Sequence, residues 1–303
     1  MDRIRRILGI GQVRKRDDDT SSKETLALEL KDEWWQKKRK KETREKILEQ
    51  NVLKRGLPES GRSKIMIKIL LGDLSGRLIG KRVIKNENEV DQETVRQIKA
   101  DGTRTLANDY EGVEMDRLVE LLMKYANHNT NVKYCQGMSD IAANVLKVFG
   151  VENDQTCFEV FSRLIELEMS SGDVGETGSI FDTRLSQMKS VMVKQKILIR
   201  KLDGNLYRIL YTNETNPVGF VAFKWMLTYF TRFNGLRDRI WEYLIFYGFD
   251  ILYYFTVAIL KYHEEEIKQA DEESLLLFLG DIESKYIEPN TVVNIVEEYM
   301  RHV

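Results

Sequence analysis

One stripe of apolar side chains restricts this chain more than any other feature of its sequence. Leu118, Leu121, Leu122 and Tyr125 recur at the i, i+3, i+4 and i+7 spacing. That spacing places all four on one face of a helix. Because an apolar face of this kind has to be buried, the pattern predicts a rigid helix packed into a core.

Two polar motifs flank this predicted helix. The segment IKADGTRT occupies residues 98–105, and YCQGMSD occupies residues 134–140. Arg104 in the first motif and Gln136 in the second are 32 residues apart. The Asp-Gly pair in the first motif is typical of a turn, so we expect Arg104 in a short polar turn. A rigid spacer between the motifs can direct both side chains at one place.

The composition favours an all-α, single-domain protein. The 303 residues include 42% hydrophobic side chains and only 3 prolines, so a sizeable core can form and few residues break helices. A net charge of −1 gives no overall attraction to nucleic acid. Two cysteines are too few for a disulfide framework, and the 3 histidines show no zinc-ligand spacing. We therefore expect a cytoplasmic protein without a metal site.

The first part of the chain predicts a flexible tail at residues 1–25, followed by a helix that ends near Leu53. The first 20 residues are charged throughout and lack an apolar core segment, so no signal peptide is predicted. Acidic residues flank the basic run KKRKK at 37–41, which indicates a solvated helix face. A localisation signal and a patch for anionic lipid are the alternatives for this run, and an amphipathic stretch at 4–10 leaves peripheral membrane contact open.

The aromatic-rich segment at residues 236–260 is long enough to raise the question of a membrane span. Charged residues interrupt it, and its uninterrupted apolar run is shorter than the ~20 residues that a span requires. We predict two consecutive core helices, broken near Gly248. The glycine-containing segment at 169–181 lacks the Gly-Lys-Ser/Thr of a phosphate loop and is predicted to be a linker.

The two polar motifs together resemble the signature pair of the TBC domain, a family of GTPase-activating proteins for Rab GTPases. The first motif reads Ile98-x-x-Asp101-x-x-Arg104, and the second reads Tyr134-x-Gln136-Gly137. The resemblance runs from about residue 34 to the end of the chain. It implies an all-α, two-lobed, multi-helix domain at 26–303, with a groove for the GTPase between the lobes.

Positions outside the motifs carry the resemblance further. Arg62 matches an arginine of the family's entry motif, but Met66 stands where the family has tryptophan. We expect this change to affect core packing rather than chemistry, because methionine fills irregular gaps. In the C-terminal half, the matching positions are Pro217, Phe220, Trp225, Phe230, Ile240, Trp241 and Gly248.

The resemblance also implies a function. Arg104 would be an arginine finger and Gln136 a glutamine finger, both supplied in trans to a GTP-loaded Rab during vesicle trafficking. The chain would not be a hydrolase itself, and it would need no cofactor, since the GTPase carries Mg²⁺ and GTP. It would act in the cytoplasm or peripherally on endomembranes. The residues expected to support the fingers or to contact the GTPase are Asp101, Thr105, Tyr134 and Gly137.

The residue types suit this chemistry. GTP hydrolysis develops negative charge on phosphate oxygens, and the fork of a guanidinium fits those oxygens. A carboxamide can accept a hydrogen bond from a water and donate another. The alternatives are a surface ion pair at Arg104 and a helix cap at Gln136, or a non-catalytic module that binds Rab as an effector or scaffold. A helical-repeat scaffold has no support, because no period of ~30–45 residues is present.

Overall fold

The structure is a computed structural model. It describes residues 52–71, 90–107, 110–129, 132–150, 153–167, 180–181, 187–211 and 217–301. The tail predicted at 1–25, the basic run at 37–41 and most of the linker predicted at 169–181 lie outside these residues. Within them the secondary structure is helical, and no strand occurs.

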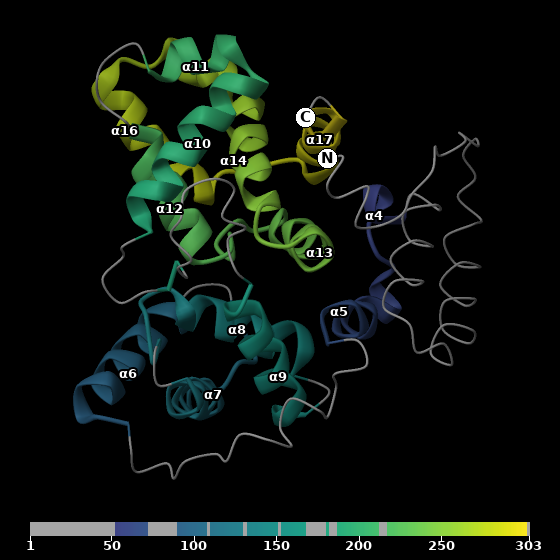
Figure 1. Cartoon of the computed structure of the whole chain (residues 1–303), viewed down its shortest axis with the longest axis vertical. Coiled ribbons are helices and arrows are strands. Elements are labelled where there is room, and N and C mark those ends of the chain that lie inside the picture. The colour runs from purple at the N-terminus through teal and green to yellow at the C-terminus, as the bar shows by residue number, and fades with distance from the viewer. Residues whose placement is uncertain are drawn as a thin grey trace.

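The described helices form two lobes (Figure 1). The N-terminal lobe occupies the lower half of that view. After the short pieces α4 (Val52–Arg55) and η1 (Glu59–Gly61), it contains α5 (Arg62–Leu71), α6 (Gln92–Leu106), α7 (Met115–His128), α8 (Met138–Phe149) and α9 (Asp154–Ile165). Helices α6, α7, α8 and α9 pack against one another. The two-lobed, all-α architecture expected from the sequence is confirmed.

The C-terminal lobe occupies the upper half of the same view, where α14 packs on α10, α13 and α17. Its helices are α10 (Met188–Leu202), α11 (Gly204–Leu210), α12 (Pro217–Leu227), α13 (Arg237–Tyr247), α14 (Ile251–Tyr262), α15 (Glu264–Gln269), α16 (Glu272–Asp281) and α17 (Pro289–Arg301), with the short η4 (Ile282–Ser284) after α16.

Aspartate and asparagine set the starts of several helices. Asp91 precedes α6 and accepts a hydrogen bond from the Thr94 N–H at 2.9 Å. Asn153 precedes α9 and accepts from the Thr156 N–H at 2.8 Å. Each side chain satisfies a backbone donor that has no partner within its own helix. These local signals explain where α6 and α9 begin.

The apolar stripe predicted from the sequence lies on α7 and faces the core. Leu118 and Leu122 are fully buried, and Tyr125 packs edge-on against Phe161 of α9 with ring centroids 5.1 Å apart. The predicted break at Gly248 separates α13 from α14, where the residue adopts a φ of 86° that favours glycine. No described helix is long and apolar enough to cross a bilayer.

The segment that links α12 to α13 joins the two lobes. Tyr229 and Phe230 both adopt positive φ values, 50° and 56°, so the chain turns sharply away from α12. The Tyr229 hydroxyl donates to the Leu164 carbonyl of α9 at 2.8 Å, and the Trp241 indole N–H donates to the Tyr229 carbonyl at 2.9 Å. Two residues in a conformation unfavourable for side-chain-bearing residues are therefore held by contacts from both lobes.

Candidate functional site

Arg104 lies in the last turn of α6, not in the polar turn that the sequence predicts. The helix continues through Asp101 and Gly102, because Gly102 packs against α7. A Cβ placed there would lie 3.0 Å from the Met115 Cε. The glycine is therefore explained by close helix packing rather than by a turn. Arg104 itself is exposed, and its guanidinium forms an ion pair with Asp101 one turn earlier.

Asp101 is buried and accepts a second hydrogen bond, from Tyr134. The Tyr134 hydroxyl lies 2.7 Å from Asp101 Oδ2, across 33 residues of sequence. Burial raises the pKa of the Tyr134 hydroxyl well above its ordinary value of 10.0, and the neighbouring Asp101 carboxylate adds to the effect. Tyr134 is therefore protonated at neutral pH and donates to Asp101. One carboxylate links the arginine of the first motif to the tyrosine of the second.

A second contact joins the same two segments. The Thr105 hydroxyl lies 2.8 Å from the Ser139 hydroxyl, and both groups are buried. Asp101 and Thr105 flank Arg104 in sequence, while Tyr134 and Ser139 flank Gln136. The two contacts therefore bracket both residues and hold the end of α6 beside the turn that precedes α8.

Gln136 is exposed in this turn and does not cap α8. The N-cap of α8 is Gly137, and no side chain forms a capping hydrogen bond there. Gly137 has a φ of 97°, and a Cβ at this position would lie 2.9 Å from the Leu227 carbonyl oxygen of α12. The sequence suggests that this glycine lets a GTPase approach. In the structure it makes room for the other lobe of its own chain.

Asp101, Thr105, Tyr134 and Gly137 share one property, which is burial in the described structure. They support the turn and the end of α6 from beneath. The two exposed residues of the predicted set are Arg104 and Gln136. Four of the six predicted site residues are therefore buried beneath the site, and two, Arg104 and Gln136, are exposed to solvent.

Sequence reasoning missed Asp140 and Arg232, which join the base of the site to the C-terminal lobe. Arg232 follows α12 and binds the Asp140 carboxylate through Nε at 3.2 Å and Nη2 at 3.3 Å. Burial raises the pKa of Asp140 above its ordinary value of 3.8, and Arg232 opposes this shift. The residues are 92 positions apart, so no local spacing could have revealed the pair. An acidic residue in the first turn of α8 was the only signal available.

The described residues offer no obvious metal centre. No group of three or more His, Cys, Asp or Glu side chains among them is arranged to hold an ion. Both cysteines are buried, and Cys135, next to Gln136, donates its backbone N–H to the Met138 sulfur at 3.3 Å. The polar groups of the site are thus an arginine, a carboxamide and their hydrogen-bonded supports.

The family model of the Rab-GTPase-TBC domain matches residues 78–268 of this sequence. The chain belongs to this family. Its match covers both polar motifs and extends from the first lobe to α15 in the second. The buried Asp101–Tyr134 contact therefore joins two polar motifs that both lie within the matched region.

Relatives and solved structures agree with this assignment. TBC1 domain family member 2B of Xenopus tropicalis is 26% identical over 225 residues, which cover 70% of this chain and 22% of that protein. Small G protein signaling modulator 3 of Bos taurus is 26% identical, over 76% of this chain and 31% of that protein. The chain thus spans less than a third of the length of these curated relatives.

Two solved structures share the fold. The RabGAP TBC domain of a Chlamydomonas flagellar protein aligns with a TM-score of 0.67 at 16% identity, covering 96% of this chain and 99% of that one. The Ypt/Rab-GAP domain of Gyp1p aligns with a TM-score of 0.67 at 14% identity, covering 94% and 98%.

The structure describes both positions of the entry motif that the sequence resemblance suggests. Met66 is buried in α5 and belongs to the core. Arg62 contacts α13, with 3.1 Å from Nη1 to Asp238 Oδ2 and 3.1 Å from Nε to Glu242 Oε1. Arg62 therefore joins the two lobes and has a structural role that differs from the one expected of Arg104 and Gln136.

Proposed function

We propose that this TBC domain accelerates GTP hydrolysis on a Rab-family GTPase by supplying Arg104 and Gln136 in trans. The proposal rests on two buried contacts on either side of Arg104 and Gln136. These are Asp101–Tyr134 at 2.7 Å and Thr105–Ser139 at 2.8 Å. These contacts hold two exposed side chains of complementary chemistry on adjacent segments. Membership of the family supports a Rab as the partner.

Arg104 would neutralise the charge that develops during phosphoryl transfer. Its guanidinium is permanently charged and forms two parallel hydrogen bonds with phosphate oxygens more readily than an ammonium does. An arginine supplied in trans accelerates GTP hydrolysis by roughly 10³–10⁵-fold. That acceleration corresponds to a barrier lower by roughly 4–7 kcal/mol.

In the unbound chain, Asp101 restrains Arg104 through their ion pair. Tyr134 in turn fixes the Asp101 carboxylate from the buried side. A side chain that is already oriented loses less conformational entropy when it enters a partner's site. Asp101 and Tyr134 would therefore act as positioning residues, and the phosphate would replace Asp101 as the anion that Arg104 binds.

Gln136 would orient the water that attacks the γ-phosphate. Its carboxamide oxygen can accept from that water, while its amide donates to a neighbouring acceptor. The left-handed turn at Gly137 and the absence of a capping hydrogen bond leave the side chain directed by the turn rather than by α8. Mg²⁺ and GTP would be held by the GTPase. The activity would regulate vesicle trafficking at the cytoplasmic face of endomembranes.

The test is single-turnover GTP hydrolysis by a panel of Rab proteins, with and without the full chain. Activation of at least one Rab is expected, and both Arg104→Ala and Arg104→Lys should abolish it, because lysine lacks the fork. Arg96 is a matched control on the same helix. It pairs with Glu93 three residues earlier, and its side chain is 71% exposed, against 69% for Arg104. Arg96→Lys should leave activation unchanged, and equal losses at both positions would contradict the proposal.

A second experiment separates the role of Gln136 from that of the GTPase's own glutamine. A Rab whose switch glutamine is changed to leucine should still be activated by the wild-type chain. Gln136→Ala should abolish activation without loss of folding stability, whereas Gln97→Ala, at an exposed position of α6, should have no effect. A resistant Rab variant together with an active Gln136→Ala protein would leave Arg104 as the only finger.

Binding measurements distinguish catalysis from scaffolding. A catalyst binds the transition state more tightly than the ground state. Affinity for GDP-loaded Rab should therefore rise when a planar γ-phosphate mimic and Mg²⁺ are added. Equal affinity with and without the mimic would instead support a non-catalytic effector.

A further inference from the structure

Helix α10 presents an unusual outer face in the C-terminal lobe. Its buried side faces the core with Val191, Gln195 and Ile199, at a spacing of four residues. On the opposite side, Val193 is 50% exposed and Ile197 is 61% exposed. Two large apolar side chains thus lie in a line along the solvent-facing side of one helix, where polar residues are the rule.

Cations continue this line at both ends. Lys189 lies four residues before Val193, and Arg200 and Lys201 lie one turn after Ile197, all exposed. Helix α10 contains no acidic residue. Among the described residues, no acidic side chain forms an ion pair with Lys189, Arg200 or Lys201. We define the α10 stripe as five residues: Lys189, Val193, Ile197, Arg200 and Lys201.

The other two cations of α10 are engaged in the fold. Lys194 binds Asp250 at 2.8 Å and lies 4.7 Å from the centre of the Tyr253 ring. Lys196 lies 4.7 Å from the centre of the Tyr211 ring. These contacts fix α10 on the lobe from both flanks. The stripe is therefore a rigid ridge. Lys189 and Lys201 are exposed on it, and the Arg200 guanidinium, also exposed, lies 5.8 Å from the centre of the Tyr207 ring of α11.

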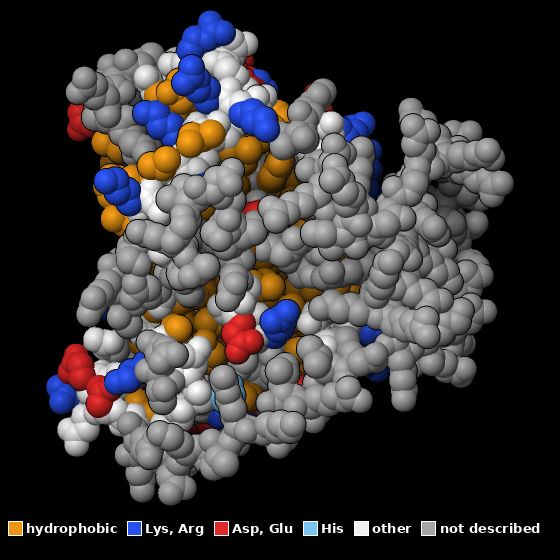
Figure 2. All heavy atoms as spheres, in the orientation of Figure 1, with side chains coloured by type: hydrophobic (Ala, Val, Ile, Leu, Met, Phe, Trp, Pro, Cys, Tyr) orange, Lys and Arg blue, Asp and Glu red, His pale blue; other side chains and the backbone are white. Residues whose placement is uncertain are grey.

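The sequence from α10 through α12 is also basic, although Lys194 is paired with Asp250 and Lys224 with Glu283. The described residues from α10 through α12 include seven Lys or Arg and a single acidic residue, Asp203, which is bound to Lys261 at 2.9 Å. Charges over the whole chain nearly cancel, with a net charge of −1. Figure 2 shows this asymmetry, with blue Lys and Arg side chains gathered around orange hydrophobic ones over α10 and α11.

We propose that the α10 stripe docks the protein on an anionic lipid surface. A single ridge with apolar residues at its centre and cations at both ends matches a plane better than it matches a peptide, which needs a groove between two ridges. Val193 and Ile197 would enter the headgroup region, while the long side chains of Lys189, Arg200 and Lys201 reach the lipid phosphates. This inference does not depend on GTPase activation.

The test is co-sedimentation of the full chain with vesicles. Binding is expected with phosphatidylcholine vesicles that contain about one-third phosphatidylserine and not with phosphatidylcholine alone. It should weaken as salt is added, because counter-ions screen surface charges. Lys189→Glu/Arg200→Glu/Lys201→Glu should lower the partition coefficient by at least about tenfold. Val193→Ser/Ile197→Ser should lower it to a similar degree.

Helix α16 provides the matched control. Leu276 and Leu277 are 52% and 71% exposed there, but acidic residues flank them at Glu273 and Asp281. Leu276→Ser/Leu277→Ser should therefore bind vesicles as the wild type does. All these positions are exposed, so circular dichroism and thermal unfolding should be unchanged in every variant.

Three results would overturn the inference. The first is wild-type vesicle binding by both α10 variants. The second is binding that disappears only when the basic run at 37–41 is neutralised. The third is a dimer in sedimentation velocity that Val193→Ser/Ile197→Ser abolishes, since this would make the stripe a contact between copies of the chain.

Discussion

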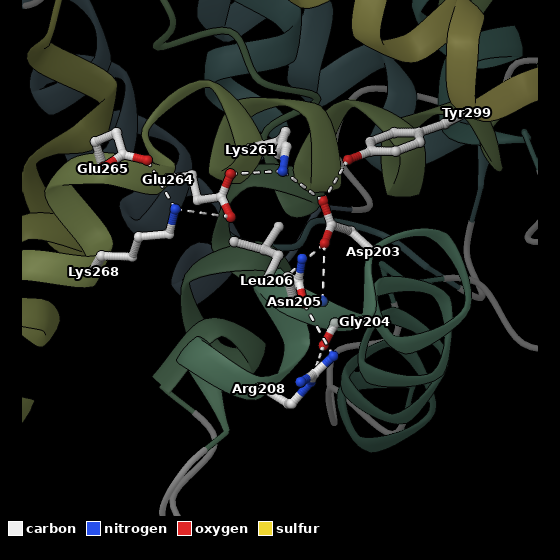
Figure 3. Close-up of polar contacts among 10 residues, drawn as sticks. All are labelled: Asp203, Gly204, Asn205, Leu206, Arg208, Lys261, Glu264, Glu265, Lys268 and Tyr299. Carbon is white, nitrogen blue, oxygen red and sulfur yellow. Dashed lines mark hydrogen bonds and ion pairs between the residues drawn. The ribbon is translucent and has the colours of Figure 1, made fainter.

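The two lobes each hold helix ends together with polar side chains, but they use different chemistry. At the N-terminal site, buried side chains form short contacts between α6 and the start of α8. The groups are the carboxylate of Asp101 and the hydroxyls of Thr105, Tyr134 and Ser139. In the C-terminal lobe the corresponding cluster is built of ions near the surface, centred on Asp203 (Figure 3).

Asp203 illustrates the second kind of connection. Its carboxylate accepts hydrogen bonds from the Leu206 N–H at 2.9 Å and the Tyr299 hydroxyl at 3.2 Å, and it binds the Lys261 ammonium at 2.9 Å. Lys261 also binds Glu264 at 2.6 Å, so α10, α11, α14, α15 and α17 meet at one place. Several charged groups stabilise the C-terminal cluster together, whereas the N-terminal site depends on a few buried hydrogen bonds. We therefore expect the N-terminal site to be sensitive to single changes and the C-terminal cluster to be tolerant.

The largest expected difference is between two glycines. Gly137→Ala should lower the free energy of unfolding by about 3 kcal/mol or more, because the φ is positive and the new Cβ meets the Leu227 carbonyl. Gly204→Ala lies at the start of α11, where no atom is within 4 Å of the new Cβ, and should stabilise by up to about 1 kcal/mol. Urea denaturation measures both free energies of unfolding. Similar losses in the two variants would contradict the expected difference between the lobes.

The next difference is between two tyrosines that each donate to an aspartate. Tyr134→Phe should cost about 1–2 kcal/mol, because it removes a donor from the buried Asp101. Tyr299→Phe should cost about 0.5 kcal/mol, because Asp203 keeps its other partners. Tyr134→Phe should also slow GTP hydrolysis on the Rab, while Tyr299→Phe should not. A slow rate in both variants would indicate a general loss of folding.

Acid should act on the two regions in opposite directions. Burial raises the pKa of Asp140, so the folded chain binds that proton more tightly and this group favours folding as pH falls. For Asp203, burial is outweighed by hydrogen bonds from the Leu206 N–H and Lys261, which lower its pKa. Its contribution is therefore present above the ordinary value of 3.8 and is lost as pH falls through the lowered pKa.

Unfolding measured from about pH 6 to pH 3 can separate these contributions. Asp203→Asn, which retains an oxygen for the cap, should lose less stability on acidification than the wild type. Asp140→Asn should lose more, since the favourable proton uptake is gone. Identical pH profiles for the two variants would show that neither carboxylate governs its region.

The smallest effect is expected at the edge of the C-terminal cluster. Lys268 contacts Glu265 at 2.8 Å and Glu264 at 3.4 Å, but it is solvent-exposed and salt screens such pairs. Lys268→Ala should leave the midpoint of thermal unfolding unchanged at physiological salt. A drop as large as that of Tyr134→Phe would contradict the idea that this cluster tolerates single changes.

Much of the fold followed from local patterns in the sequence. The apolar stripe that includes Leu118 predicted a buried helix, and the glycine at 248 marked the break between two core helices. Both features depend on residues a few positions apart, for which helical periodicity and backbone conformation are sufficient. The motif order also paired Arg104 with Gln136, and the roles of these two residues stay a prediction.

The sequence could not supply the contacts that form between helices and between lobes. Gly102 looked like a turn residue because its contact with Met115 is invisible without the packing of α6 on α7. The reason for glycine at 137 lies with Leu227, and the partner of Asp140 is 92 residues away. Tertiary contacts of this range override local signals and leave no spacing to detect.

The link between Asp140 and Arg232 has a consequence for how the protein is made. A ribosome delivers the N-terminal lobe first, and the helices α6 to α8 contact one another over short sequence distances. The segments that contain Arg104 and Gln136 can therefore meet while the second lobe is still being synthesised. Arg232 has not yet emerged at that stage, and the Asp140 carboxylate has no guanidinium to bind. We therefore expect the surface around Asp140 to be complete only after the segment that follows α12, with Arg232, has been synthesised.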